Sequence, residues 1–137
     1  MSVTTEKPAA PDSSNGHSGC LLCGSRNPRS LNLSFQPEAE GAVRTVFQAR
    51  DELQGYDHIL HGGVIAALLD GAMTHCLFHQ QVKALTGDLR VRFVRSIPCD
   101  ALLDIRARIL YSHPPLYRLR AEIVQAGVLT HRGERIG

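Results

Sequence analysis

Residues 61–73 read HGGVIAALLDGAM, in which a histidine and two glycines precede an apolar stretch with one aspartate in its middle. The segment from about Gly62 to Gln81 lacks both proline and the alternation of a strand, so it predicts a helix. Its apolar residues occupy nearly all sides of the predicted helix, which indicates that the helix is buried on most sides. Adjacent glycines cost conformational entropy, and a carboxylate among apolar side chains costs desolvation. Both choices are poor for stability, which points to a functional purpose.

The sequence on both sides of this helix alternates between apolar and polar residues, which is the period of a β-strand. Two such segments precede the helix and three or four follow it, because the alternation of the last, short segment is weak. They are LNLSF (31–35), AVRTVFQAR (42–50), LRVRFVRSI (89–97), LLDIRARILY (102–111), YRLRAEIV (117–124) and VLTHRGERI (128–136). We expect the apolar residues of each segment to face inward.

This order of elements favours an α+β fold. A single helix cannot cover both faces of a sheet, so we expect a curved antiparallel β-sheet wrapped around one long central helix. Such a sheet leaves an edge exposed, which predicts self-association by edge pairing or helix packing. The length of 137 residues suits one domain with one moderate core. We assign residues 19–137 to that domain and residues 1–18, which are polar and rich in proline and serine, to a disordered tail.

Composition and charge exclude several classes of protein. Hydrophobic residues make up 43% of the chain and charged residues 20%, which is an ordinary globular mixture. The net charge of +2 is too small to predict a nucleic-acid partner. No apolar run approaches the roughly 20 residues of a membrane span, and the first residues lack the apolar region of a signal peptide. We therefore expect a cytoplasmic protein that binds neither nucleic acid nor a membrane.

Four cysteines occur in the chain, and in an unsecreted protein they are expected to be thiols rather than a disulfide framework. The stretch HSGCLLCG (17–24) places His17, Cys20 and Cys23 at a spacing that could supply three zinc ligands. No second C-x2-C pair is present in the sequence to close a tetrahedral structural site. We therefore expect buried or free thiols without a metal, and zinc is the alternative.

Arginine recurs on the polar side of the predicted strands that follow the helix. We expect these side chains to form a solvated face with partial pairing to Asp104 and Glu122. The alternative is that one or two of them bind the phosphates of an anionic ligand. The six residues are Arg90, Arg92, Arg106, Arg108, Arg118 and Arg120.

Gly62 and Gly63 begin the predicted helix, where backbone N–H groups have no partner within the helix. Glycines leave these donors open to a ligand oxygen, and the helix dipole adds partial positive charge there. The combination suits an oxyanion or a polarised carbonyl. His61, directly before them, is either a capping residue of the helix or a part of this site.

Asp70 lies two turns further along the same helix. Its neighbours at i−4, i−3 and i+4 are Ala66, Ala67 and Thr74, which are small enough for a cleft to open over the carboxylate. A carboxylate in such a cleft suits a general base or a nucleophile. The alternative is a structural carboxylate that pairs with a neighbouring arginine.

Gly62 and Asp70 lie about 12 Å apart on one helix, at about 1.5 Å per residue. At that separation they cannot act on one carbonyl within a single subunit. A two-fold dimer with antiparallel helices would bring the Gly62 of one chain to the Asp70 of the other and would form two equivalent sites.

A second group of candidate ligands lies near the end of the predicted helix. His75 and His79 occupy positions i and i+4 with Cys76 beside them, which is the spacing of a metal-binding face. These residues point well away from Asp70, so we expect core or interface histidines instead.

Three stretches of the chain resemble hotdog-fold acyl-CoA thioesterases of the PaaI-like group. GYDHILHGGVIAALLDGAM (55–73) is similar to the family's central motif. CLLCGSRNP (20–28) is similar to its N-terminal C-x-x-C-G…N-P segment, and LTGDLRVRFVRSIP (85–98) to its first strand after the helix. The resemblance spans about residues 20–130, and the spacing from HGG to the aspartate together with the C-x-x-C-G start makes it specific.

The resemblance implies roles for particular residues. The backbone amide of Gly62, with His61 beside it, matches the group that polarises the thioester carbonyl. Asp70 of the partner subunit matches the catalytic carboxylate, and Thr86 matches a hydroxyl that helps to hold the lytic water. Substrate contacts are expected from Gly55, His58, Gly63, Ala66, Ala67 and Thr74.

The chain departs from the family's pattern at several positions. Many relatives have asparagine and glycine where this chain has Gly55 and His58, and several have glutamate where it has Gly71. These changes affect the acyl pocket and the placement of the water rather than the reaction class. The last strand also looks short for the family.

The resemblance therefore implies hydrolysis of an acyl-CoA thioester to the free acid and CoA by a homodimer or a dimer of dimers, with no metal or redox cofactor. Pantetheine would run along the dimer interface, and surface arginine or lysine would meet the nucleotide phosphates. One alternative is a non-catalytic acyl-CoA-binding or regulatory module on the same fold. The other is a hotdog dehydratase of 3-hydroxyacyl thioesters that recruits His58 or His61.

Overall fold

The computed structural model describes residues 16–137, so residues 1–15 of the predicted tail lie outside the described part of the chain. One long helix, six strands and two short 3-10 turns make up that part. In chain order they are β1 (Gln36–Pro37), η1 (Ala39–Gly41), β2 (Val43–Gln48), η2 (Asp51–Leu53), α2 (Gly62–Phe78), β3 (Asp88–Phe93), β4 (Leu102–His113), β5 (Leu116–Gln125) and β6 (Val128–Ile136). None of these helices is long and apolar enough to cross a membrane.

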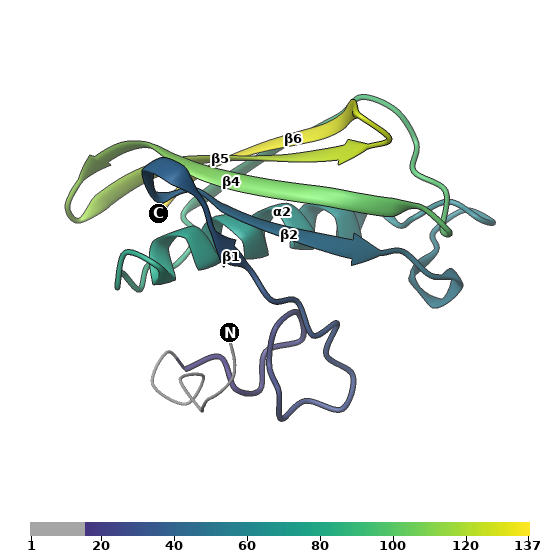
Figure 1. Ribbon diagram of the computed structural model, residues 1–137, viewed down its shortest axis with the longest axis horizontal. Coiled ribbons are helices and arrows are strands. Elements are labelled where there is room, and N and C mark those ends of the chain that lie inside the picture. Colours follow the sequence, from purple (N-terminus) through teal and green to yellow (C-terminus); the bar gives the residue numbers. More distant parts are fainter. Residues whose placement is uncertain (1–15) are drawn as a thin grey trace.

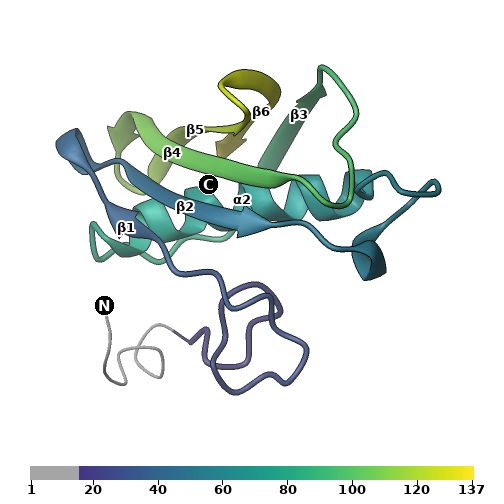
Figure 2. The same cartoon turned by 45° about the vertical axis from the view of Figure 1, so that its right-hand side comes forward.

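The six strands form one antiparallel sheet in the order β1-β2-β4-β5-β6-β3. β3 follows α2 directly in the chain but lies at the far edge of the sheet, beside β6, so α2 connects the two sides of the sheet. The sheet curves over one side of α2 (Figures 1 and 2). The predicted α+β arrangement, a curved antiparallel sheet around one long central helix, is confirmed.

The core lies between the sheet and α2, and alternate residues of three strands point into it. The predicted inward positions are confirmed for Val43, Thr45, Phe47, Leu103, Ile105, Ala107, Leu119, Ala121 and Ile123. The helix contributes the buried residues Ile65, Leu68, Leu69, Ala72, Met73, Cys76 and Leu77. β3 differs, because Leu89 and Val91 are half-buried and Phe93 is exposed. The reason is that β3 is an edge strand, with a neighbour on one side alone.

The chain before β1 covers α2 on the side away from the sheet (Figures 1 and 2). Leu22 packs so closely that a Cβ added at Gly71 would lie 2.8 Å from its Cδ1 atom. The predicted strand over residues 31–35 is wrong. Asn32 adopts a φ of 54°, which breaks an extended backbone, and the amide of the buried Leu33 donates to the Leu22 carbonyl instead of joining the sheet.

α2 ends three residues earlier than the apolar pattern predicts. The last helical residue is Phe78 rather than Gln81. Gln81 adopts a left-handed φ of 60°, and the Val82 amide turns back to donate to the Leu77 carbonyl at 2.9 Å. This local geometry caps the helix and directs the chain toward β3.

β6 is a full strand rather than the weak, short one that the sequence predicts. It has nine residues and pairs with β5 on one side and β3 on the other. Its alternation is hard to read in the sequence because the inward positions hold His131, Gly133 and Arg135 instead of large apolar residues. Backbone pairing on both sides maintains the strand without an apolar inner face.

Candidate functional site

The first part of the candidate site is the N-terminus of α2. His61 is the N-cap residue, with φ −61° and ψ 134°, and its Nδ1 atom accepts a hydrogen bond from the Gly63 amide at 2.8 Å. This cap occupies one of the N–H donors that a helix start leaves without a partner. The Gly62 amide has no acceptor within residues 16–137. Of the two predicted glycine donors, Gly62 is therefore the one that remains for a ligand.

An open hollow of about 480 Å³ adjoins Gly62. The loop before α2 and the helix start line it with Gln54, Gly55, Tyr56, Ile59, Leu60, His61 and Gly62. Gly55 lies against His61, since a Cβ added there would be 3.3 Å from the His61 Cα and Cδ2 atoms. The structure thus brings Gly55, His61 and Gly62 together. His58 does not line the hollow, and it adopts a φ of 63° in the loop.

The second part of the candidate site is the carboxylate of Asp70. Its Oδ1 atom accepts a hydrogen bond from the Thr86 hydroxyl at 2.7 Å. The same oxygen lies 3.3 Å from Nη1 of Arg135, with which Asp70 forms an ion pair. The side chain of Asp70 is 34% exposed, so the carboxylate remains in contact with solvent in the single chain.

Arg135 of β6 lies buried beneath Asp70, with 1% of its surface exposed. Its Nη1 atom also donates to the Thr74 hydroxyl, and its Nη2 atom donates to the Ala84 carbonyl at 2.6 Å. Burial lowers the pKa of the Arg135 guanidinium, and the charge of Asp70 opposes that shift. The arginine therefore links the middle of α2 and the loop before β3 to the last strand.

Sequence patterns alone did not predict Arg135, although the pairing of Asp70 with an arginine was one of the two alternatives. A signal that could have found it lies in β6. There Arg135 lies two residues after Gly133 and four after His131, so the alternation of the strand places all three on the inner face. An arginine on the inner face of a strand requires a buried acceptor. Asp70 is the one acidic residue in the sequence of α2.

The two parts of the candidate site lie apart within one chain. Gly62 and Asp70 are separated along α2 by about 12 Å, at about 1.5 Å per residue. Ala66 and Ala67 are half-buried on the turns between them. One chain thus presents an amide half-site at the start of α2 and a carboxylate half-site in its middle, and the two do not meet.

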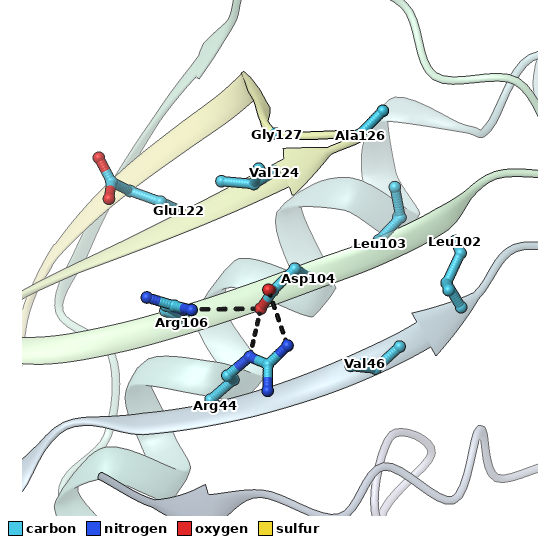
Figure 3. A pocket seen from close by; sticks show the side chains of 10 residues that line it. All are labelled: Arg44, Val46, Leu102, Leu103, Asp104, Arg106, Glu122, Val124, Ala126 and Gly127. Atoms are coloured by element: carbon cyan, nitrogen blue, oxygen red, sulfur yellow. Dashed lines mark hydrogen bonds and ion pairs between the residues drawn. The ribbon is translucent and has the colours of Figure 1, made fainter.

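The outer face of the sheet carries the predicted arginines together with acidic partners. Arg44 donates two hydrogen bonds of 2.9 Å to Asp104, and Arg106 lies 3.6 Å from the same carboxylate (Figure 3). These partners, the Arg44 hydrogen bond first, lower the pKa of Asp104. The predicted pairing with Asp104 is confirmed, whereas Arg120 pairs with Glu134 at 2.6 Å. The hollow of about 500 Å³ in Figure 3 therefore presents both signs of charge.

The histidines near the end of α2 lie outside the candidate site, and His75 packs against the core. His75 Nε2 is buried without a hydrogen-bond partner among the described atoms. Burial, helped by the charges of His17 and His79, lowers the pKa of His75 to about 4. Burial raises the pKa of Cys76 to about 11, and its thiol donates to the Gly41 carbonyl at 3.3 Å. His79 is exposed, and the convergent metal-ligating group among the described residues does not include His75, Cys76 or His79.

Replacing Arg135 with alanine should lower the free energy of unfolding by about 3–5 kcal/mol, because it removes a buried guanidinium that pairs with the half-buried Asp70 and empties its space. Arg120→Ala is the matched control, since it breaks a half-buried pair on the outer face of the sheet and should cost about 0–1 kcal/mol. Urea denaturation followed by circular dichroism measures both. Arg135→Met fills the space and should lose less than Arg135→Ala. Equal losses for Arg135→Ala and Arg120→Ala would contradict a structural role for this pair.

The sequence matches the model of one protein family. The family is described as the Thioesterase superfamily, and the match covers residues 57–127, more than half of the chain. Gly62, Asp70 and Thr86 lie inside this range, whereas Arg135 and the segment before β1 lie outside it. No curated protein matches the chain.

Several solved structures share the fold. A thioesterase superfamily protein has a TM-score of 0.77 at 22% identity over 82% of this chain. This chain spans 59% of the length of that protein. A single-residue variant of phenylacetic acid degradation protein PaaI from Thermus thermophilus has a TM-score of 0.70 at 22% identity, over 77% of this chain and 91% of that one.

A hypothetical thioesterase protein from Streptococcus pneumoniae, in a crystal structure with coenzyme A, has a TM-score of 0.72 at 14% identity. The similarity covers 77% of this chain and 86% of that protein. At these identities the likeness concerns the fold. One helix packed against a six-stranded antiparallel sheet is the hotdog fold of these structures, as the sequence predicts.

Proposed function

Because this chain belongs to the thioesterase superfamily, we propose that it hydrolyses an acyl-CoA thioester to the free acid and CoA. The observation that carries the proposal is the pair of complementary half-sites on α2. One offers an amide donor that has no acceptor within residues 16–137, and the other offers a carboxylate that two donors orient. Thioester hydrolysis needs both functions, a donor for the carbonyl oxygen and a base or nucleophile.

In the proposed reaction the Gly62 amide of one subunit polarises the thioester carbonyl, and Asp70 of the other subunit activates water. The water oxygen adds to the carbonyl carbon while its proton passes to Asp70. The C–S bond then breaks, the acid is released, and the CoA thiolate takes up a proton. Direct attack by Asp70, with an anhydride that water then hydrolyses, is the other route for the same carboxylate.

The contacts of Asp70 support different roles for its two carboxylate oxygens, one held by the protein and one open to the reaction. Thr86 and Arg135 both bind Oδ1, and no described side chain donates to Oδ2. Oδ2 is therefore the oxygen that we assign to the water or the carbonyl carbon. In this role Thr86 orients the carboxylate directly, and Thr74 acts through Arg135 rather than by contact with substrate.

A homodimer would complete the site, and a dimer of dimers is compatible with it. The edge strand β3 supports this proposal, because its outer backbone groups are unpaired with any described strand and Phe93 is 54% exposed. The Phe93 ring also lies beside Gly62, since a Cβ added at Gly62 would be 3.4 Å from its Cε1 atom. Dimerisation at this edge would place the interface next to the amide half-site.

The finer parts of the proposal follow from the resemblance of the sequence to PaaI-like thioesterases. We place the protein in the PaaI-like group and assign substrate contacts to Gly55, His58, Gly63, Ala66 and Ala67. Pantetheine would follow the dimer interface, with surface arginines or lysines at the CoA phosphates. We also propose a cytoplasmic location, because no cysteine forms a disulfide within residues 16–137.

Subunit complementation tests the shared site. Asp70→Asn and Gly62→Pro are each expected to be inactive in CoA release from an acyl-CoA panel. When they are co-expressed with two different tags, each mixed dimer keeps one site free of both substitutions. With random pairing about half of the dimers are mixed, and each mixed dimer has one intact site out of two. About one quarter of the wild-type activity should therefore return.

The control is co-expression of Asp70→Asn with Thr86→Val. Both substitutions lie in the carboxylate half-site, so every site of the mixed dimer carries one of them and no activity should return. Failure of the Asp70→Asn and Gly62→Pro pair to recover activity, in mixed dimers isolated through both tags, would contradict a site shared between subunits.

A further inference from the structure

The segment before β1 gathers three metal-ligating side chains that the proposed reaction does not use. The ligand atoms of His17, Cys20 and Cys23 all lie within 4.8 Å of one another, and each residue is half-buried. Among residues 16–137 this is the one group of three or more histidine, cysteine or acidic side chains with such convergence. The sequence spacing H-x2-C-x2-C allows this convergence but does not require it.

The distance between Cys23 and His17 in this cluster equals the length of an edge of a zinc tetrahedron. Zn–S bonds are about 2.3 Å and Zn–N bonds about 2.0–2.1 Å, so tetrahedral ligands place sulfur and nitrogen about 3.6 Å apart. The Cys23 Sγ and the His17 Nδ1 atoms are 3.6 Å apart. A disulfide between Cys20 and Cys23 is not formed.

The backbone around Cys20 is folded as a tight turn. The Leu22 amide donates to Cys20 Sγ at 3.3 Å. The Gly24 amide donates to the Cys20 carbonyl at 2.9 Å. A Cβ added at Gly24 would lie 2.3 Å from the Cys20 nitrogen and 2.5 Å from the Ser18 carbonyl oxygen, so glycine alone fits.

Hydrogen bonds outside the cluster hold this turn in place. The Asn27 side chain donates to the Gly19 carbonyl at 3.1 Å, and the Arg26 amide donates to the Ser18 carbonyl at 2.9 Å. Leu22, between the two cysteines, packs against Gly71 of α2. The cluster is thus anchored to the face of the helix that lies away from the sheet.

We propose that His17, Cys20 and Cys23 bind one Zn²⁺ ion, which fastens the segment before β1 to α2. Two thiolates and an imidazole are a soft donor set that suits zinc rather than magnesium or calcium. The described residues supply three ligands, and a water molecule takes the fourth position. The proposed zinc is structural. By holding the turn between the two cysteines, it would hold Leu22 against Gly71, the residue next to Asp70. This proposal does not depend on the thioesterase reaction.

The first test is the zinc content of the full chain, purified under reducing conditions and measured by plasma mass spectrometry. We expect about one zinc per chain, and less than about a tenth of that for Cys20→Ser and for Cys23→Ser. Cys99→Ser is the matched control, because Cys99 is a buried cysteine of the core far from this cluster in the sequence. It should retain the wild-type zinc content.

The main readout of the second test uses the wild-type chain alone. Zinc is removed from the wild-type chain with a chelator, and Co²⁺ is then titrated in as a spectroscopic probe. Thiolate-to-cobalt charge-transfer absorption that saturates at about one Co²⁺ per chain supports the site, and Zn²⁺ should displace it. Chelation should also lower the melting temperature of the wild-type chain but not that of Cys20→Ser. A metal-free chain that gives no such absorption, or a Cys20–Cys23 disulfide under the same conditions, would overturn the proposal.

Discussion

Asp70→Asn should lower kcat for CoA release by about 10²–10⁴-fold, the range that a positioned general base contributes. Asparagine has the shape of aspartate, and its Oδ1 atom can still accept from Thr86 and Arg135, which hold this oxygen at 2.7 and 3.3 Å. The amide cannot take a proton from water or attack a carbonyl. Free CoA is measured with a thiol reagent over a panel of short, long and aromatic acyl-CoAs.

Asp104→Asn is the matched control for this substitution. Asp104 is also paired with arginines, but it lies on the outer face of the sheet (Figure 3), so CoA release should stay within about twofold of wild type. Equally slow CoA release by wild type and Asp70→Asn would contradict the hydrolase and favour a non-catalytic acyl-CoA-binding module. Hydration of enoyl-CoA substrates by the wild type would favour the dehydratase instead.

Gly62→Pro should lower kcat by about 10²–10³-fold, which is the typical cost of removing one oxyanion donor. Gly62 is the first residue of α2, where proline is well tolerated, and the substitution removes the one N–H group that we assign to the carbonyl oxygen. Proline also requires an extended residue before it, and His61 has φ −61° and ψ 134°. The fold should therefore accept this proline.

Gly62→Ala separates the loss of the donor from the added bulk. Alanine keeps the N–H group and places a Cβ atom 3.4 Å from Phe93 Cε1, an ordinary contact that the proline shares. We expect Gly62→Ala to retain at least about ten times the activity of Gly62→Pro. Circular dichroism melts of both variants check that the helix is intact. If alanine and proline reduce kcat equally, obstruction rather than the lost donor is responsible, and the assigned role of the amide is wrong.

Much of the fold could be read from the residues because each element carries a local pattern. The start of α2 follows from His61 and the glycines, and the inward faces of β2, β4 and β5 follow from alternation with a period of two. The sequence-based predictions are wrong where alternating apolar residues are buried without forming a strand. Leu31, Leu33 and Phe35 alternate like a strand, but Asn32 is left-handed and the segment packs under the helix.

The candidate site could be predicted in part. The sequence pointed to Gly62, Asp70 and Thr86, and the structure places the Thr86 hydroxyl on the Asp70 carboxylate at 2.7 Å. Arg135 was not found, because it lies 65 positions from Asp70 in a strand whose inner face is polar. Periodicity records which side of an element is buried, but it does not record which distant residue lies opposite.

The sequence by itself determined one helix with an open amide at its start and a carboxylate in its middle, because helix period, glycine and residue spacing are local properties. The tertiary structure alone decided what these groups meet. The order of the sheet places β6 beside β3 and so brings Arg135 under Asp70. The packing of Leu22 on Gly71 places the cluster of His17, Cys20 and Cys23 against α2. Such contacts depend on the path of the whole chain, which no short stretch of residues encodes.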